Sequence, residues 1–221
     1  DFDNSVITFT GPARWDFQRW GPRQRYYLEN YRAALDEPGE WYLDRKTGFL
    51  SYIPKRDEEV REAVAPFIKQ FVLVQGDPDN RRYVEHVRIA GMSFQYGSWD
   101  LPEEGISDPQ AAVSIPAAIQ ANGMRHCAIE GCEIAHVGIY GVWLQRGCSY
   151  NRIERNHIHD LGAGGVRIGE TRTAKESHVA THHNTVHNNW IHDGGHVYHA
   201  AVGVWIGRSD GNTISHNEIS D

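Results

Sequence analysis

The chain has 221 residues, of which 40% are hydrophobic and 23% are charged, and its formal net charge is −7. This charge disfavours a nucleic acid or an anionic membrane as a general partner, and no apolar run is long enough to span a bilayer. The three cysteines, an odd number, argue against a disulfide framework. The sequence starts at Asp1 with no signal peptide, so we expect a processed or excised segment of one large or two small domains. Nothing in the composition indicates an oligomeric state.

The first 82 residues differ in character from the rest and predict an N-terminal region packed on the remainder of the chain. Residues 27–35 place apolar side chains at helical spacing and are followed by a Pro-Gly stop. Residues 41–54 predict a β-hairpin, because aromatic and apolar stretches flank a turn with Gly48 at the expected left-handed position. These elements predict a small α+β insertion, and a strand within residues 67–76 is expected to lead out of it.

Residues 83–221 carry one short pattern several times. Copies of the frame N-x-[IV]-x-x-N-x-I-x-D begin at Cys127, Asn151, Asn184 and Asn212, and an earlier coil begins at Val87. Repetition at intervals of about 20–50 residues is typical of a solenoid, in which each unit buries its apolar face only against its neighbours. The apolar runs are short and are broken by Asn, Gly and Asp, which favours strands over helices. The sequence therefore predicts an all-β fold, a right-handed parallel β-helix.

Aligning the copies stacks like residues in columns. The two Asn positions of the frame predict ladders of buried amides that satisfy one another's hydrogen bonds, with Cys127 and Cys132 as small substitutes in the first copy. A second strand follows each complete copy, and its alternation sends Val and Leu or Ile inward. The coil at Val87 is expected to carry the apolar frame at Ile89, Met92 and Phe94.

The last copy is incomplete. Asp221 follows the inward Ile219 closely, and neither a second strand nor a capping element comes after it. Because a solenoid needs a cap on its terminal coil, we expect this chain to be a C-terminally truncated fragment.

Four strings carry a resemblance: WGPRQRYYLEN from Trp20, DEPGEWYLDRKTGFLSYIP from Asp36, SIPAAIQANG from Ser114 and HIHDLGAGGVRIGE from His157. The long N-terminal strings are specific, unlike the coil repeat. The four strings resemble right-handed parallel β-helix proteins of glycoside hydrolase family 141. Members of that family include an α-L-fucosidase acting on pectic polysaccharide and xylan-active enzymes, and they are similar in fold to family 120 β-xylosidases. The resemblance implies a carbohydrate-active enzyme with a carbohydrate substrate. It also implies a further coil after Asp221 that carries a second catalytic carboxylate. We expect an extracellular or periplasmic location.

Acidic residues at the end of the repeated frame are candidate catalytic groups. Asp160, Asp193 and Asp221 share a column with His136, and successive coils lie only about 4.8 Å apart. Most glycoside hydrolysis uses two carboxylates that flank the scissile bond. Asp221 stands out because HNEI-x-D resembles a family string with a catalytic carboxylate. For Asp160 and Asp193 the alternative is ordinary turn chemistry, with the carboxylate bound to local backbone N–H groups.

Glu170 is a fourth candidate catalytic acid. It ends the string GVRIGE, at the same edge as the outward-facing Arg167. The alternative role for Glu170 is a surface salt bridge with Arg167 or Arg172.

An outward column formed by Trp143, Arg167 and Trp205 predicts a substrate-binding groove. Aromatic faces stack on sugars, and an Arg side chain can bind hydroxyls or the carboxylate of an acidic sugar. The alternative is that loop 171–182 or loop 194–201 folds over the column and makes a cation–π sandwich without a ligand.

The 13 histidines raise the question of a metal site. His157 and His159 share one strand face, and His159 shares a column with His192, yet no Cys or carboxylate spacing completes a recognised metal motif. We therefore predict no metal and no cofactor, and we assign His159 and His192 to orienting the sugar. A calcium site of Asp and backbone carbonyls stays open, because uronate lyases require one.

The leading functional hypothesis is a glycoside hydrolase that acts on plant cell-wall polysaccharide, xylan or pectic, with paired carboxylates. One alternative is a polysaccharide lyase or uronate epimerase on the same fold, which abstracts a proton with Lys, Arg or His and often uses Ca²⁺. The other is a carbohydrate-binding solenoid without catalytic activity.

Overall fold

The chain divides into two compact units, Asp1–Ala65 and Pro66–Asp221, and the computed structural model describes residues 21, 31–100 and 109–221. The expected boundary at residue 82 is too far along the chain. The reason is that β3 (Val72–Gln75) already pairs in parallel with β7 (Ala117–Asn122) of the second unit. This β3 is the strand that was expected within residues 67–76.

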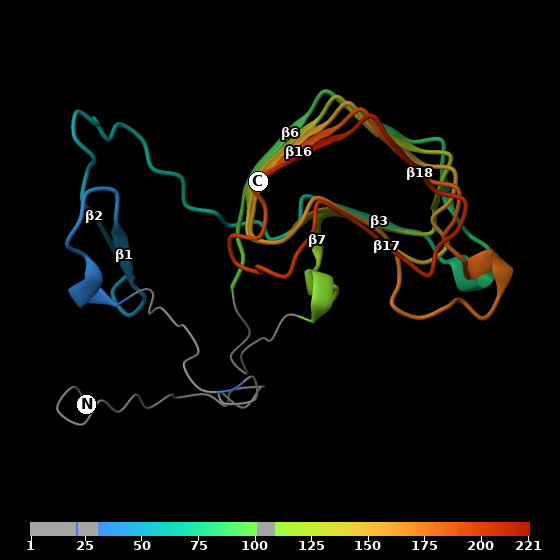
Figure 1. Cartoon of the computed structure of the whole chain (residues 1–221), viewed down its shortest axis with the longest axis horizontal. Helices are drawn as coiled ribbons and strands as arrows, with labels where there is room; N and C mark the ends of the chain where they lie inside the picture. The colour runs from blue at the N-terminus through green and yellow to red at the C-terminus, as the bar shows by residue number, and fades with distance from the viewer. Residues whose placement is uncertain (1–20, 22–30, 101–108) are drawn as a thin grey trace. The chain divides into compact units, whose positions relative to one another are not determined.

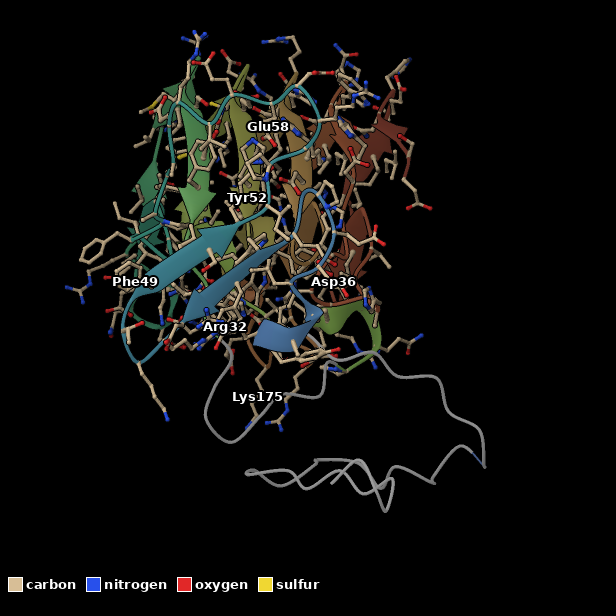
Figure 2. All side chains as sticks on the ribbon, turned by 90° about the vertical axis from the view of Figure 1, so that its left-hand side faces the viewer. Arg32, Asp36, Phe49, Tyr52, Glu58 and Lys175 are labelled. Atoms are coloured by element: carbon tan, nitrogen blue, oxygen red, sulfur yellow. The ribbon has the colours of Figure 1, made fainter. Side chains whose placement is uncertain are left out.

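The first unit holds a β-hairpin. β1 (Trp41–Asp44) and β2 (Phe49–Tyr52) pair antiparallel, and Gly48 in the connecting turn has a φ of 76°. Both the hairpin and its left-handed glycine are thus confirmed. Figure 2 labels both ends of β2, and at its far end the Tyr52 hydroxyl donates a hydrogen bond to the Glu58 carboxylate.

Residues 27–30 of the expected helix over 27–35 lie outside the described residues, and residues 31–35 are described. Its described part contains one 3-10 turn, η1 (Arg32–Ala34).

The second unit is a parallel β-helix, in which successive coils add strands to three five-stranded sheets. Sheet I contains β6 (Ser93–Gly97), β10 (Glu133–Val137), β13 (His157–Leu161), β16 (Trp190–His192) and β19 (Glu218–Ile219). Sheet II contains β3, β7, β11 (Tyr140–Leu144), β14 (Val166–Gly169) and β17 (Val204–Gly207). Sheet III contains β5 (Arg88–Ala90), β9 (Ala128–Glu130), β12 (Arg152–Glu154), β15 (Thr185–His187) and β18 (Thr213–Ser215). Figure 1 shows the coils nearly superimposed, with sheet I and sheet II facing each other.

Short elements complete the coils. β4 (Val84–Glu85) pairs in parallel with β8 (Met124–Arg125). Three single 3-10 turns lie between strands: η2 (Pro78–Asn80), η3 (Gln110–Ala112) and η4 (Ser177–Val179). η2 and η4 contact each other at one corner of the β-helix.

The inward apolar positions stack in register. Ile134, Ile158 and Ile191 lie side by side on adjacent strands of sheet I and are at most 2% exposed. Burial of each such side chain contributes about 1.5–3 kcal/mol, so these columns hold the coils together. In the earliest coil Phe94 is in register with Ile134 and is buried, as expected, whereas the expectation is wrong at Met92, which is 52% exposed.

Two Asn ladders line the turns between sheets, as predicted. The Asn156 amide donates from Nδ2 to Asn189 Oδ1 (2.9 Å), and Asn189 donates in the same way to Asn217 (2.9 Å). Cys132 occupies the same position on the preceding coil, where its backbone N–H donates to Asn156 Oδ1 (2.9 Å). In the second ladder, the backbone N–H of Cys127 donates a hydrogen bond to Asn151 Oδ1 (3.0 Å). The predicted role of both cysteines as buried ladder substitutes is therefore confirmed.

Candidate functional site

Four coils of sheet I have a left-handed residue near the end of the strand, at equivalent positions. Tyr96, His136, Asp160 and Asp193 have φ angles of 60°, 53°, 49° and 49°, in the left-handed region that Asp and His enter more readily than most residues. A left-handed residue interrupts the alternation of the strand. Two successive side chains, such as those of His159 and Asp160, are therefore partly exposed on the same coil.

We call Asp160, Asp193 and Asp221 the Asp column. Asp160 and Asp193 are two of the left-handed residues, and imidazoles contact their carboxylates. Asp160 Oδ2 lies 2.5 Å from His136 Nδ1, and Asp160 Oδ1 lies 3.4 Å from His196 Nε2. Asp193 Oδ2 lies 2.8 Å from His192 Nδ1. Within the described part of the chain, these partners are imidazole side chains. The local backbone N–H groups that the turn alternative requires are not among them.

Beside the Asp column, sheet I presents a face of imidazole and aromatic rings. His157 is in register with Trp190, and His159 is in register with His192. The His157 ring is stacked on Trp190 (ring centroids 4.3 Å apart, interplanar angle 4°) and on His159 (3.9 Å). The His159 and His192 rings are also nearly parallel, at 5.1 Å. We call the set of Glu133, His157, His159, Trp190 and His192 the histidine face.

Glu133 anchors the histidine face on the preceding coil. Its carboxylate accepts hydrogen bonds from Ser93 Oγ (2.9 Å) and Gln95 Nε2 (2.5 Å), and its Oε1 lies 3.3 Å from His159 Nε2. The bonds from Ser93 and His159 lower the pKa of the Glu133 carboxyl. Burial, and then the charges of His159 and His192, lower the pKa of His157. Glu133 is thus kept as an acceptor and His157 as a neutral ring.

Asp221 continues the Asp column by one coil. Ile219 pairs with Ile191 in sheet I, which places Asp221 on the coil next to Asp193. A hollow of about 220 Å³ is lined by Asp221, His192 and a glycine-rich part of the neighbouring coils. Asp160, Asp193 and Asp221 therefore lie along one edge, as predicted.

Glu170 lies in a different place from the Asp column. It follows β14 in sheet II and lines a cavity of about 500 Å³ together with Arg146, Arg172 and Lys175. Burial raises the pKa of the Glu170 carboxyl against the opposing charges of Arg167 and Arg146. Glu170 also lines an adjoining hollow with Trp205. Glu170 and Trp205 thus line one hollow. Neither this hollow nor the cavity is lined by Asp160, Asp193 or Asp221.

The expectation of an open Trp–Arg–Trp stripe is wrong at Arg167, which is fully buried. Its guanidinium donates to the carbonyl oxygens of Val113 (2.6 Å) and Ile115 (2.5 Å) and lies 3.7 Å from the centre of the Trp143 ring. Burial lowers the pKa of Arg167 to about 10. The cation–π alternative is correct: segment 113–115 binds the guanidinium, and Tyr198 of the named loop 194–201 packs in the same buried cluster as Trp143. Arg167 is therefore a structural residue, and Trp143 packs beside it.

The residues that could hold a metal ion are imidazoles of the histidine face. His157, His159 and His192 each offer one ring nitrogen, and these three atoms lie within 4.8 Å of one another. The sequence identified each of these histidines but did not group all three. His192 completes the group because it lies on the next coil, opposite His159.

Sequence reasoning missed Glu133, Trp190 and His196. Glu133 and Trp190 are both in register with His157, so the alignment that gave the inward Ile columns also contained this outward column. His196 has no such signal, because it lies in an irregular loop whose path only the structure shows.

The sequence matches the family described as "Right handed beta helix region" over residues 85–219, more than half of the chain. The chain belongs to this family. No curated protein matches this right-handed β-helix chain. Its fold is similar to that of a solved structure described as "Glycoside hydrolase", with a TM-score of 0.80 and 21% sequence identity over 86% of this chain and 39% of that chain. This chain thus corresponds to less than half of the length of that protein. None of the helices in the described residues could cross a membrane.

Proposed function

We propose that this right-handed β-helix is a glycoside hydrolase of plant cell-wall polysaccharide, xylan or pectic, with the Asp column as its catalytic edge. The observation that carries the proposal is the stacking of Asp160, Asp193 and Asp221 on successive coils beside the histidine face. Similarity in fold to a solved glycoside hydrolase supports the class of enzyme, and so does the resemblance to family 141. Cell-wall polysaccharide lies outside the cell that degrades it, so the proposal includes an extracellular or periplasmic location.

The spacing of coils suits the chemistry of glycosidic bonds. Neighbouring coils are about 4.8 Å apart, close to the separation of about 5–5.5 Å between the two carboxylates of retaining enzymes. Carboxylates two coils apart approach the upper end of the range of about 6.5–9.5 Å found in inverting enzymes. We assign the catalytic pair to neighbouring coils, and Asp193, the middle member of the column, belongs to both such pairs, with Asp160 and with Asp221. The proposal therefore depends most on Asp193.

In this proposal the neighbouring rings position the carboxylates and the sugar. One carboxyl group protonates the leaving oxygen, and the other attacks the anomeric carbon or activates water. His192 orients Asp193, and His136 and His196 orient Asp160. Trp190 is 46% exposed and offers its ring to the apolar face of a sugar.

The test is hydrolysis of xylan and pectic oligosaccharides by the full-length protein and its Asp193→Asn variant. We expect product release by the wild type and a loss of about 10²–10⁴-fold in kcat for the variant, the usual effect of removing a general acid or base. Asp210→Asn is the matched control, because Asp210 is an exposed acid of the same β-helix outside the Asp column. Wild-type turnover by Asp193→Asn would remove the catalytic assignment.

Glu170→Gln is the competing variant in the same assay. Glu170 has a raised pKa and shares a hollow with Trp205, so it is the alternative general acid in this unit. The proposal expects nearly unchanged kcat for Glu170→Gln. A large loss for Glu170→Gln together with wild-type activity for Asp193→Asn would move the active site to the sheet II cavity.

One observation favours a polysaccharide lyase as a second candidate. The imidazoles of His157 and His159 stand on the same face as the carboxylates, and a lyase needs a base to abstract the C5 proton of a uronate. Unsaturated products that absorb in the ultraviolet, with activity abolished by a chelator, would select this candidate. Binding of oligosaccharide by the complete protein without any turnover would instead support a carbohydrate-binding solenoid.

A further inference from the structure

Three imidazoles of the histidine face converge on one point of sheet I. His157 and His159 are the outward residues of β13, and His192 is the residue of β16 opposite His159. His157 Nε2 lies 2.8 Å from His192 Nε2, and one ring nitrogen from each of the three histidines lies within 4.8 Å of the other two. Zinc binds imidazole nitrogen at about 2.0–2.1 Å, so two nitrogens of a tetrahedral site are roughly 3.4 Å apart. The 2.8 Å pair is closer than this spacing and the 4.8 Å limit is wider, so binding an ion would require side-chain rotations that move the nitrogens by about 1 Å.

Carboxylates around the three imidazoles are placed as they are around metal-bound histidines. His192 Nδ1 lies 2.8 Å from Asp193 Oδ2, and a hydrogen bond from Nδ1 to a carboxylate leaves the Nε2 lone pair for a metal ion. This Nε2 is the atom that faces His157. The pairing of a carboxylate, a histidine and an open nitrogen is the usual outer arrangement of a zinc ligand.

Glu133 supplies a fourth donor. Its Oε1 lies 3.3 Å from His159 Nε2, and hydrogen bonds from Ser93 and Gln95 to the other oxygen fix its orientation. An ion bound at His159 Nε2 would have this carboxylate oxygen within reach. Three nitrogen donors and one carboxylate oxygen suit zinc and its neighbours, whereas calcium and magnesium prefer oxygen alone.

We propose that His157, His159 and His192, with Glu133, form a binding site for a divalent transition-metal ion of the zinc class. The ion would link β10, β13 and β16, and so join three successive coils at the edge where the Asp column lies. The inference does not rest on the proposed hydrolysis, because it concerns ligand geometry alone.

The experiment is calorimetric titration of the chelator-treated 221-residue chain with Zn²⁺, with the thermal unfolding midpoint as a second readout. We expect saturable binding of one ion per chain and a higher midpoint with Zn²⁺, because a ligand that binds only the folded state stabilises it. His192→Gln should weaken the binding at least tenfold, and Glu133→Gln should weaken it less.

His187→Gln is the matched control. His187 lies in β15, on the same coil as His192 but in sheet III, where its Nδ1 is bound to Ser215. This variant should bind Zn²⁺ as the wild type does. Equal loss in His187→Gln and His192→Gln would show general binding to surface histidines and would overturn the proposal, as would the absence of saturable binding to the wild type.

Cobalt gives a test that needs no variant. Co²⁺ held by three imidazoles and a carboxylate should show the intense visible absorption of four- or five-coordinate cobalt. A spectrum identical to that of hydrated Co²⁺ would also overturn the proposal. Failure of either metal test leaves the hydrolysis proposal standing, because the hydrolysis assay is a separate measurement. Loss of hydrolysis in Asp193→Asn likewise says nothing about metal binding by the wild-type chain, which the titration measures directly.

Discussion

The Asn ladders and the Asp column are both stacks of one residue type at a fixed position of the coil, yet their surroundings differ. Asn156 and Asn189 are buried, and their amides are bound to one another and to backbone groups of the neighbouring coils. Asp160 is partly exposed and Asp193 is exposed, and both carboxylates are bound to imidazoles. A repeated residue therefore has a structural role where the stacked side chains make hydrogen bonds to backbone groups. It marks a candidate site where their partners are other side chains at the surface.

The largest effect on stability is expected from Arg167→Ala, because Arg167 is fully buried and makes hydrogen bonds to two backbone carbonyl groups. The change removes the guanidinium donor to the carbonyl oxygens of Val113 and Ile115, the second of which belongs to a buried residue, and opens a cavity beside Trp143. We expect the free energy of unfolding to fall by about 3–5 kcal/mol, measured by urea denaturation. Arg152→Ala, at an exposed arginine, should cost less than about 1 kcal/mol. Equal stability of the two variants would contradict the buried role of Arg167.

Asn156→Ala tests the ladder itself. It removes the acceptor of the Cys132 N–H and the donor to the Ile129 carbonyl, and each unsatisfied buried group costs about 1–3 kcal/mol. We expect a loss of about 2–4 kcal/mol in the free energy of unfolding. Asn188→Gly, at an exposed left-handed position of the next coil, should change it by less than about 1 kcal/mol. If both changes had the same small effect, the ladder would not be the scaffold.

Trp190→Ala tests whether the exposed histidine face binds the sugar. Stacking of a ring on a ligand is worth about 0.5–1.5 kcal/mol, so we expect oligosaccharide affinity of the full-length protein to fall about 2–10-fold. Isothermal titration would measure this affinity. Trp41→Ala in the hairpin unit, where Trp41 is 62% exposed, should leave it unchanged. Affinity that survives in Trp190→Ala would place the sugar elsewhere.

The smallest effect is expected from Glu170→Gln, and it depends on pH. Burial raises the pKa of Glu170 above its usual value of 4.5, so the folded state prefers the protonated acid. The wild type then loses stability as the pH rises through the folded pKa, and Gln does not. Glu170→Gln should therefore be more stable than the wild type at pH 7, by up to about 1 kcal/mol, and the difference should vanish at pH values below 4.5. Thermal unfolding at both pH values measures it, and an advantage that persists at low pH would contradict the cause.

The repeated frame was sufficient to predict the coils, the ladders and the column from Asp160 to Asp221, because a solenoid places equal positions of its copies directly above one another. The environment of Arg167 could not be read in this way. Its cover comes from residues 113–115, which precede the copies and do not repeat. The contact of Asp160 with His196 likewise depends on the path of an irregular loop. The approach of His157, His159 and His192 follows from the predictable register, but the directions of their rings depend on contacts with Trp190 and Glu133 that the frame does not reveal.

The most direct test of the difference between the Asn ladder and the Asp column uses Asn189 and Asp193, the two residues that flank β16. The full-length protein would be assayed for both the unfolding midpoint and kcat/KM, at a temperature where every variant is folded. We predict that Asn189→Ala lowers the midpoint and leaves kcat/KM near the wild-type value, whereas Asp193→Asn keeps the midpoint and lowers kcat/KM by at least about 100-fold. If Asn189→Ala lost activity while still folded, or Asp193→Asn kept it, the division between scaffold and site would be wrong.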